Sequence, residues 1–152
     1  MRLSKNFSLR EFIKSDTATR LDINNVPSQE VIDNLKLLCE NVLQPLREHY
    51  AKPIVISSGY RSPELNSTVG GSKTSDHCQG FAADINALDG DNGDLYEAII
   101  DLDLEFKQLI HEYGDENNPD WIHISYDESN NKGQKLRAIR RDGQTTYMSI
   151  FS

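Results

Sequence analysis

The chain has 152 residues, of which 37% are hydrophobic and 26% are charged, a composition that predicts one folded domain with a hydrophobic core and excludes a disordered chain. The formal net charge of −8 argues against a nucleic-acid partner, because such partners favour a basic surface. No apolar stretch is long enough to span a membrane, so we expect no membrane-embedded segment.

The first third of the chain is predicted to be mostly helical. The segment Ser8–Glu11 has the pattern of a capping box that begins a short helix. Ser28 is expected to cap a long helix that ends near His49, and Pro45, which lacks a backbone donor, is expected to kink it. Apolar residues recur every three or four positions along this helix and predict one buried stripe, made by Val31, Leu35, Leu38, Val42 and Leu46.

The rest of the chain is predicted to contain β-strands, with short helices at Pro63–Val69 and Leu95–Leu102. The dipeptide Asp142-Gly143 is a strong hairpin signal between the last two strands. Helices followed by strands indicate the α+β class, with helices packed on an antiparallel sheet, and we interpret residues 1–152 as a single domain. Strands are expected at Ile54–Ser57, Phe81–Ile85, Phe106–Glu112, Trp121–Tyr126, Arg137–Arg141 and Thr145–Phe151.

Two histidines and one aspartate form a set of potential metal ligands. The segment Ser75–Ile85, SDHCQGFAADI, places His77 seven residues before Asp84, and His123 lies in the short apolar run WIHIS. A catalytic zinc site typically has three protein ligands and leaves its fourth position to water. We therefore predict that His77, Asp84 and His123 bind Zn²⁺ and that the protein is a hydrolase.

The alternation of side chains along the predicted strands supports this set. Successive side chains point to opposite faces of a strand, so Ala83 is expected in the core and Asp84 on the other face. The same alternation separates Ile122 from His123. Gly80 allows the chain to turn sharply between the first histidine and its neighbouring strand. Each strand-borne ligand is thus expected on a strand whose other face is anchored in the core.

Three motifs resemble the zinc D-Ala-D-Ala carboxypeptidase family, the M15 peptidases: S-x-H-x-x-G-x-A-x-D from Ser75 to Asp84, D-W-x-H from Asp120 to His123, and SGYRS at Ser58–Ser62. Relatives of this family include D-Ala-D-Ala dipeptidases and phage endolysins that cut L-alanyl-D-glutamate bonds, and the Hedgehog signalling domain shares its fold. The resemblance covers roughly residues 7–126. It implies a Hedgehog/DD-peptidase-like fold and a substrate that is peptidoglycan or another D-amino-acid peptide.

The resemblance also implies roles for single residues. The three predicted ligands fall on the family's zinc ligands. Asp120 falls on the general base, and Arg61 falls on an arginine that binds substrate or stabilises the oxyanion. Around the metal, substrate-binding residues are expected at Arg61, Ser75, Tyr60 and Trp121.

Several alternatives stay open at this point. Asp76, Glu112 and Asp127 are alternative general bases. A competing hypothesis is a non-catalytic binding module stabilised by zinc, in which Cys78 or His111 closes the site as a fourth ligand. The bond cleaved is also open, because D-Ala-D-Ala carboxypeptidase, L-Ala-D-Glu endopeptidase and D,D-dipeptidase activities all fit the motifs.

The N-terminal residues MRLSKNFSLREF lack the apolar core of a signal peptide, so we expect synthesis in the cytoplasm. If the substrate is peptidoglycan, we expect delivery to the cell wall by a phage holin, by a virion or by another secretion route.

Overall fold

The computed structural model describes residues 1–150; Ser152 and Phe151, the predicted end of the last strand, lie outside the described residues. The first third of the chain contains a two-stranded sheet and helices, namely β1 (Arg2–Ser4), β2 (Phe7–Ser8), α1 (Leu9–Ile13), α2 (Asp16–Arg20), α3 (Gln29–Leu38), the π-helical segment η1 (Cys39–Leu43) and α4 (Gln44–Tyr50). The remainder contains β3 (Ile54–Ser58), α5 (Pro63–Thr68), the 3₁₀ helix η2 (Asp76–Gln79), β4 (Ala82–Ala87), α6 (Asn92–Leu102), β5 (Gln108–Glu112), β6 (Trp121–Ser125), β7 (Gln134–Arg141) and β8 (Gln144–Ser149).

The predicted long helix is present as α3, η1 and α4, which follow one another directly along the chain. The Ser28 hydroxyl accepts a hydrogen bond from the Val31 backbone N–H at 3.3 Å and caps the first turn. The buried stripe is confirmed, since Leu35, Leu38, Val42 and Leu46 have no exposed surface and Val31 has little. A π-helical segment, η1, directly precedes α4, whose first turn contains Pro45, and the kink expected at this proline stays a prediction.

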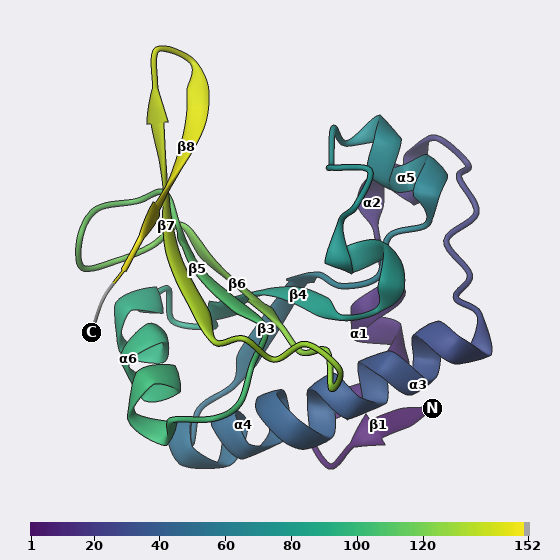
Figure 1. Ribbon diagram of the computed structural model, residues 1–152. Helices are drawn as coiled ribbons and strands as arrows, with labels where there is room; N and C mark the ends of the chain where they lie inside the picture. Colours follow the sequence, from purple (N-terminus) through teal and green to yellow (C-terminus); the bar gives the residue numbers. More distant parts are fainter. Residues whose placement is uncertain (151–152) are drawn as a thin grey trace.

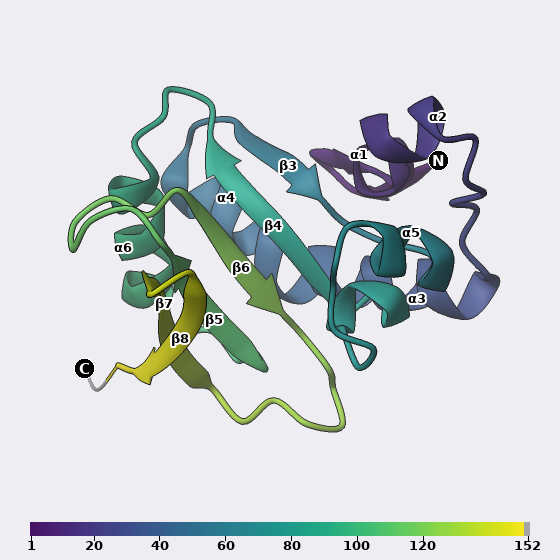
Figure 2. The ribbon, with the colours of Figure 1, turned by 90° about the horizontal axis from the view of Figure 1, so that it is seen from above.

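Six strands form one sheet in the order β3-β4-β6-β5-β7-β8 (Figure 2). Its neighbouring pairs are antiparallel except for β5 and β7, which run parallel with Gln108 opposite Gln134. The sheet is therefore mixed rather than purely antiparallel. The reason is the connection after β6, which passes beyond β5 before β7 begins and is tied to the start of β5 by the Gly133 N–H, which donates to the Phe106 carbonyl at 2.9 Å.

The helices α3, α4 and α6 lie along one side of the sheet, whereas α5 and the β7–β8 hairpin rise from the other side (Figure 1). The core includes the completely buried side chains Leu109, Ile122 and Ile124 together with the apolar stripe of the long helix. Burying each such side chain contributes roughly 1.5–3 kcal/mol. The predicted α+β class, with helices packed on a sheet, is confirmed. Within residues 1–150, no helix combines the length and the apolar character needed to cross a bilayer.

Candidate metal centre

His77 lies on η2, a short helix whose two ends are shaped by its neighbours. The Ser75 hydroxyl accepts a hydrogen bond from the His77 N–H at 3.2 Å at the start of the helix. Gly80 ends it with φ +76°, and a Cβ at this glycine would lie 2.7 Å from the Val31 carbonyl oxygen. The sharp turn predicted at Gly80 is thus present.

The His77 ring is buried and oriented by a backbone carbonyl. Its Nδ1 lies 2.7 Å from the Gly59 carbonyl oxygen. A carbonyl can only accept a hydrogen bond, so Nδ1 carries a proton and Nε2 is the ring nitrogen that faces the other potential ligands. That Nε2 atom lies 3.4 Å from Asp84 Oδ1. Metal-binding histidines are commonly oriented in this way by a hydrogen bond from the second ring nitrogen.

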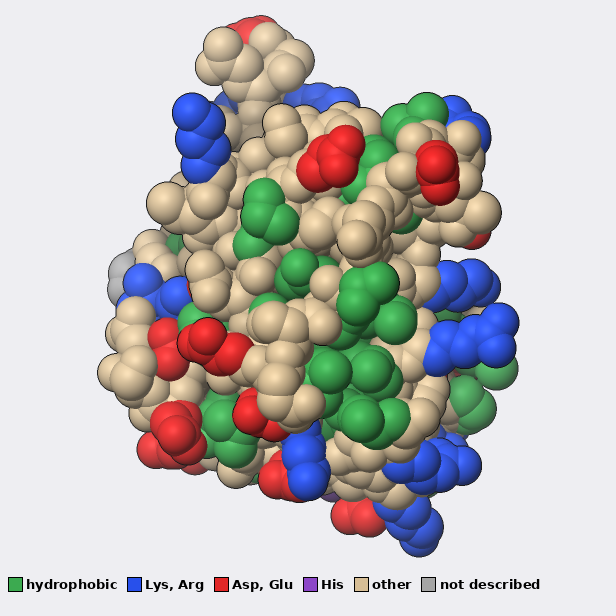
Figure 3. All heavy atoms as spheres, turned by 90° about the vertical axis from the view of Figure 1, so that its right-hand side faces the viewer, with side chains coloured by type: hydrophobic (Ala, Val, Ile, Leu, Met, Phe, Trp, Pro, Cys, Tyr) green, Lys and Arg blue, Asp and Glu red, His purple; other side chains and the backbone are tan. Residues whose placement is uncertain are grey.

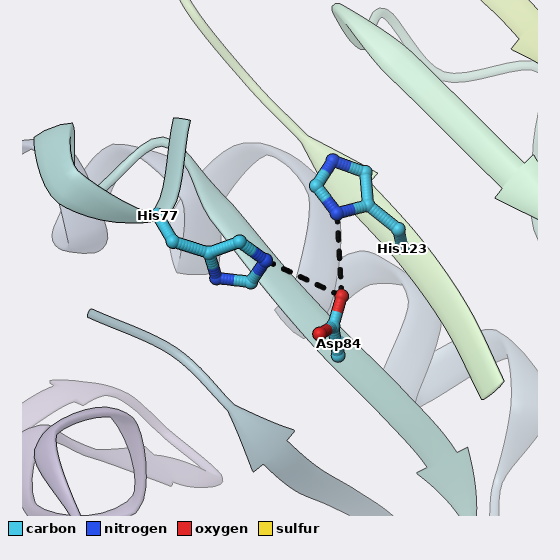
Figure 4. Close-up of side chains that lie close together, drawn as sticks. All are labelled: His77, Asp84 and His123. Atoms are coloured by element: carbon cyan, nitrogen blue, oxygen red, sulfur yellow. Dashed lines mark hydrogen bonds and ion pairs between the residues drawn. The ribbon is translucent and has the colours of Figure 1, made fainter. Parts of the chain in front are cut away.

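Asp84 and His123 are direct neighbours across β4 and β6. His123 Nδ1 lies 3.2 Å from Asp84 Oδ1, and the His77 and His123 ring centroids are 5.2 Å apart. Figure 4 shows both rings directed toward the same carboxylate oxygen. The long-range pairing of two strands and one helical turn therefore brings the three predicted ligands together, with all three donor atoms within 4.8 Å of one another.

The three donor atoms lie close enough together to share one metal ion, since all are within 4.8 Å of one another. The two contacts to Asp84 Oδ1 measure 3.2 and 3.4 Å. Metal–nitrogen bonds of about 2.0–2.1 Å in a tetrahedron place the ligand atoms roughly 3.3–3.4 Å apart. Two imidazoles and a carboxylate are also a ligand set that a divalent transition metal accepts.

The charge state of Asp84 matches this role. Burial alone raises the pKa of the carboxyl group, but hydrogen bonds and charges from His123 and His77 outweigh burial and hold the pKa well below its usual range. Asp84 is therefore ionised at neutral pH, as a metal ligand must be.

The three side chains face a cavity of about 660 Å³. Its walls come from the segment after α5, from β5 and β6, and from the β7–β8 hairpin. A second cavity of about 560 Å³ shares Asp84, Arg61 and Val69 with the first and continues toward Lys14 and Thr17. The hollow thus extends on both sides of Asp84.

Besides Asp84, Glu112 is a carboxylic acid on the same side of the sheet as His123. It lies at the end of β5, opposite Trp121 on β6, and its side chain lines the cavity. Burial raises the pKa of Glu112 to about 7, with a further upward contribution from Asp84, against opposing contributions from His123 and from a hydrogen bond with Trp121. A carboxyl group with such a pKa exchanges protons readily at neutral pH.

Asp120, the predicted general base, occupies a different position. Asp120 is exposed and does not line the cavity. Its backbone is held on both sides, because its N–H donates to the Glu112 carbonyl at 2.9 Å and its carbonyl accepts from Asn92 Nδ2 at 3.1 Å. The catalytic role of Asp120, which the family resemblance implies, therefore stays a prediction.

The other predicted site residues divide between the two cavities. Arg61 lines both, its backbone N–H donates to the His77 carbonyl at 3.2 Å, and its Nε is buried without a hydrogen-bond partner among the described residues. Ser75 and Trp121 line the cavity at the three potential ligands, whereas Tyr60 is buried and lines only the second cavity.

The two additional potential ligands lie outside the cluster of three. His111 is buried on the opposite face of β5, where its Nε2 lies 2.7 Å from the Asp115 carbonyl oxygen. Cys78 is a free thiol whose pKa is raised, mainly by burial, so it is largely protonated at neutral pH. Within residues 1–150, the only cluster of potential metal ligands consists of His77, Asp84 and His123.

Comparison with known proteins agrees with the motifs. Residues 5–125 match the sequence model of a family described as Peptidase M15. This match contains the three clustered side chains and Glu112, and it ends before the β7–β8 hairpin. No curated protein matches the chain.

Proposed function

The chain belongs to the peptidase M15 family, and from this membership and the geometry of the cavity we propose that it is a zinc-dependent peptidase that hydrolyses stem-peptide bonds of peptidoglycan. The observation that carries the proposal is a cluster of three ligands, His77, Asp84 and His123, that faces a cavity together with a buried carboxylic acid. The motif resemblance to D-Ala-D-Ala carboxypeptidases and endolysins supports the choice of peptidoglycan.

Glu112 is our candidate for the general base, in place of Asp120. When bound by the three ligands, zinc supplies a water molecule with a pKa near 7 and polarises the scissile carbonyl group. Glu112 accepts a proton from the attacking water, whose oxygen bonds to the carbonyl carbon. Glu112 then transfers this proton to the amine nitrogen as the C–N bond breaks. Its place in the cavity beside His123 and its raised pKa suit both transfers.

Arg61 is positioned to stabilise the negative charge that develops on the carbonyl oxygen. It lies where the two cavities meet, and its Nε has no hydrogen-bond partner among the described residues. A buried donor without a partner is costly, and a developing oxyanion or a substrate carboxylate would satisfy it. The hydrogen bond from its backbone to the His77 carbonyl couples its position to the metal ligands.

The shape of the hollow favours an endopeptidase over a carboxypeptidase. A carboxypeptidase needs room for only one residue beyond the scissile bond. Here the two cavities, of about 660 and 560 Å³, extend to both sides of Asp84. The extended hollow supports an endopeptidase, and because the motifs also resemble endolysins that cut L-alanyl-D-glutamate bonds, we propose this bond as the one cleaved.

The alternative of a zinc-stabilised binding module needs a site closed by four protein ligands. The cluster in residues 1–150 has three, and neither Cys78 nor His111 belongs to it. Nothing in the site favours this alternative over catalysis.

The test is digestion of purified peptidoglycan by the zinc-loaded protein, with mass spectrometry of the released fragments and a chelated sample as control. We expect peptides that begin at D-glutamate. Release of single D-alanine residues would show a carboxypeptidase instead, and an absence of any chelator-sensitive product would contradict the proposal.

Two matched carboxylate variants identify the base. We expect Glu112→Gln to retain zinc and to lower kcat by about 100- to 10,000-fold. Asp120→Asn should keep kcat within a few-fold of the wild type. The reverse pattern would return the role of general base to Asp120.

A further inference from the structure

The β7–β8 hairpin forms one wall of the cavity at the metal ligands. Leu136 and Arg140 of β7 and Tyr147 of β8 line this cavity together with Glu112 and His123. The strand register explains why, because Ala138 lies opposite Glu112 in β5 and opposite Tyr147 in β8. Arg140 is two residues beyond Ala138 and so faces the same side of the sheet. The hairpin tip projects from the top of the molecule (Figures 1 and 3).

Arg140 is a cation without a carboxylate partner in this cavity. Its guanidinium lies over the Tyr113 ring, 5.2 Å from the centroid, and residues 1–150 show no salt bridge to it. The Tyr113 hydroxyl is in turn hydrogen-bonded to Thr145 Oγ1 of β8 at 2.5 Å, which holds the ring against the hairpin. An aromatic platform thus supports the guanidinium and leaves its N–H donors free.

The two aspartates of the cavity already have partners, and the other arginine, Arg61, lies where the two cavities meet rather than on the hairpin. Asp76 Oδ1 accepts a hydrogen bond from Lys107 Nζ at 2.7 Å, and Asp84 contacts two histidines. In a chain with a formal charge of −8, an arginine that faces the cavity without an acidic partner is a binding group for an anion. A guanidinium binds a carboxylate through two parallel hydrogen bonds.

The order of the strands indicates which part of the substrate this carboxylate belongs to. Across the sheet, β5 with Glu112 lies between β6 with His123 and β7 with Arg140. Glu112 must reach the amine nitrogen to return its proton, so the released fragment lies on the Glu112 side of the metal ligands. Neighbouring strands are about 4.8 Å apart, so Arg140 is within reach of the first residues of that fragment.

We propose that Arg140, supported by Tyr113, binds a carboxylate on the fragment that is released from the C-terminal side of the scissile bond. This inference rests on the proposed function. For an L-Ala-D-Glu bond, the carboxylate is the free α-carboxylate of the D-glutamate residue, whose side chain continues the peptide. The hairpin lies outside the residues that match the family, so the subsite depends on a segment beyond that match.

The test uses two synthetic peptides with the sequence L-Ala-γ-D-Glu-L-Lys, one with the free α-carboxylate and the other with that group amidated. We expect the zinc-loaded wild type to show a kcat/KM about 10- to 100-fold higher for the free carboxylate, as a charge-assisted hydrogen bond predicts. Arg140→Ala should abolish this preference through KM, with kcat changed only a few-fold, and Arg140→Lys should restore part of it. Arg141→Ala is the matched control, because Arg141 is exposed and does not line the cavity.

A binding measurement separates this inference from the proposed function. Calorimetry on zinc-loaded Glu112→Gln, with and without Arg140→Ala, gives the Kd of both peptides without turnover. We expect Arg140→Ala to weaken only the carboxylate peptide. If the wild type cleaves neither peptide but this selective loss of binding is found, the proposed reaction fails and the subsite stands. Equal weakening of both peptides, or no binding of either, would overturn the subsite.

Discussion

His123 on β6 and His111 on β5 lie on neighbouring strands but face opposite sides of the sheet. His123 faces the cavity, where its Nδ1 lies 3.2 Å from Asp84 Oδ1. His111 faces the helical side, where its ring packs against Tyr96 with centroids 5.6 Å apart and its Nε2 lies against a backbone carbonyl. Both are histidines in apolar strands, and only one meets the other potential ligands.

The face of the strand on which a polar side chain lies therefore determines which other groups it can contact. On the helical side, the hydrogen bond to the Asp115 carbonyl satisfies His111 locally. On the cavity side, side chains from β4, β5, β6 and η2 converge and can share a ligand. The same contrast is found within one strand, because Glu112 directly follows His111 in β5 but faces the cavity.

Substitution of each histidine in turn should have very different consequences for activity. His123→Ala should lower kcat/KM for peptidoglycan peptides by about 1,000-fold or more, because removal of a ligand removes several kcal/mol of transition-state stabilisation. His111→Ala should lower Tm but keep zinc content and kcat/KM within a few-fold at temperatures where it is folded. Kinetics and elemental analysis check both variants. Loss of zinc from a folded His111→Ala variant would contradict the interpretation that His111, on the helical side of the sheet, takes no part in metal binding.

The second largest effect is expected when the metal ion is removed, and it concerns the thermal stability of the protein. A ligand that binds only the folded state at 100 times its Kd adds about 2.7 kcal/mol, which corresponds to a rise in Tm of roughly 5–10 °C for a chain of this size. We expect zinc to raise the Tm of the wild type and of His111→Ala by this amount. His123→Ala should show little response. Differential scanning calorimetry with and without chelator measures the shift, and an equal response of all three proteins would argue against the cluster as the metal site.

A smaller effect is expected from the ion pair beside His77. Lys107 Nζ lies 2.7 Å from Asp76 Oδ1, and both side chains are less than one-fifth exposed. Lys107→Met leaves this carboxylate without its partner and should lower the free energy of unfolding by about 1–3 kcal/mol. Adding Asp76→Asn should recover part of the loss. Urea unfolding of the chelated proteins measures both changes, and no recovery in the double variant would show that Lys107 acts through packing alone.

The two faces of β5 should also differ in pH dependence. Burial raises the folded-state pKa of Glu112 from 4.5 to about 7, so its contribution to the stability of the chelated protein is lost as pH rises across that interval. Burial lowers the pKa of His111, so its contribution is lost as pH falls below 6.5. Urea unfolding against pH should show that Glu112→Gln removes the first dependence and His111→Ala the second. A Glu112→Gln variant that keeps the wild-type slope between pH 4.5 and 7 would contradict this assignment.

Much of the framework was predictable because it depends on local patterns. The apolar stripe from Val31 to Leu46, the cap at Ser28 and the hairpin at Asp142-Gly143 all follow from short-range spacing. The parallel pairing of β5 and β7 was not predicted, because the chain's route around β5 leaves no periodic signal in the sequence.

The site was predictable only in part. Glu112 appeared among several alternative bases, and the alternation that points it to the cavity was present in its strand. Arg140 and Lys107 were missed, although alternation from Leu136 through Ala138 already places Arg140 on one face. No short-range pattern in the sequence indicates which strand will be the neighbour of β7 in the sheet.

Local sequence patterns were thus enough to identify the potential ligands His77, Asp84 and His123, and to predict the side of its own strand on which each strand-borne residue lies. The placement of β5 between β6 and β7, which brings Glu112 and Arg140 to the same cavity, is seen only in the folded chain. The two features depend on interactions over different distances along the chain. A two-residue period sets the face within a strand, whereas the order of strands results from packing between segments far apart in the chain.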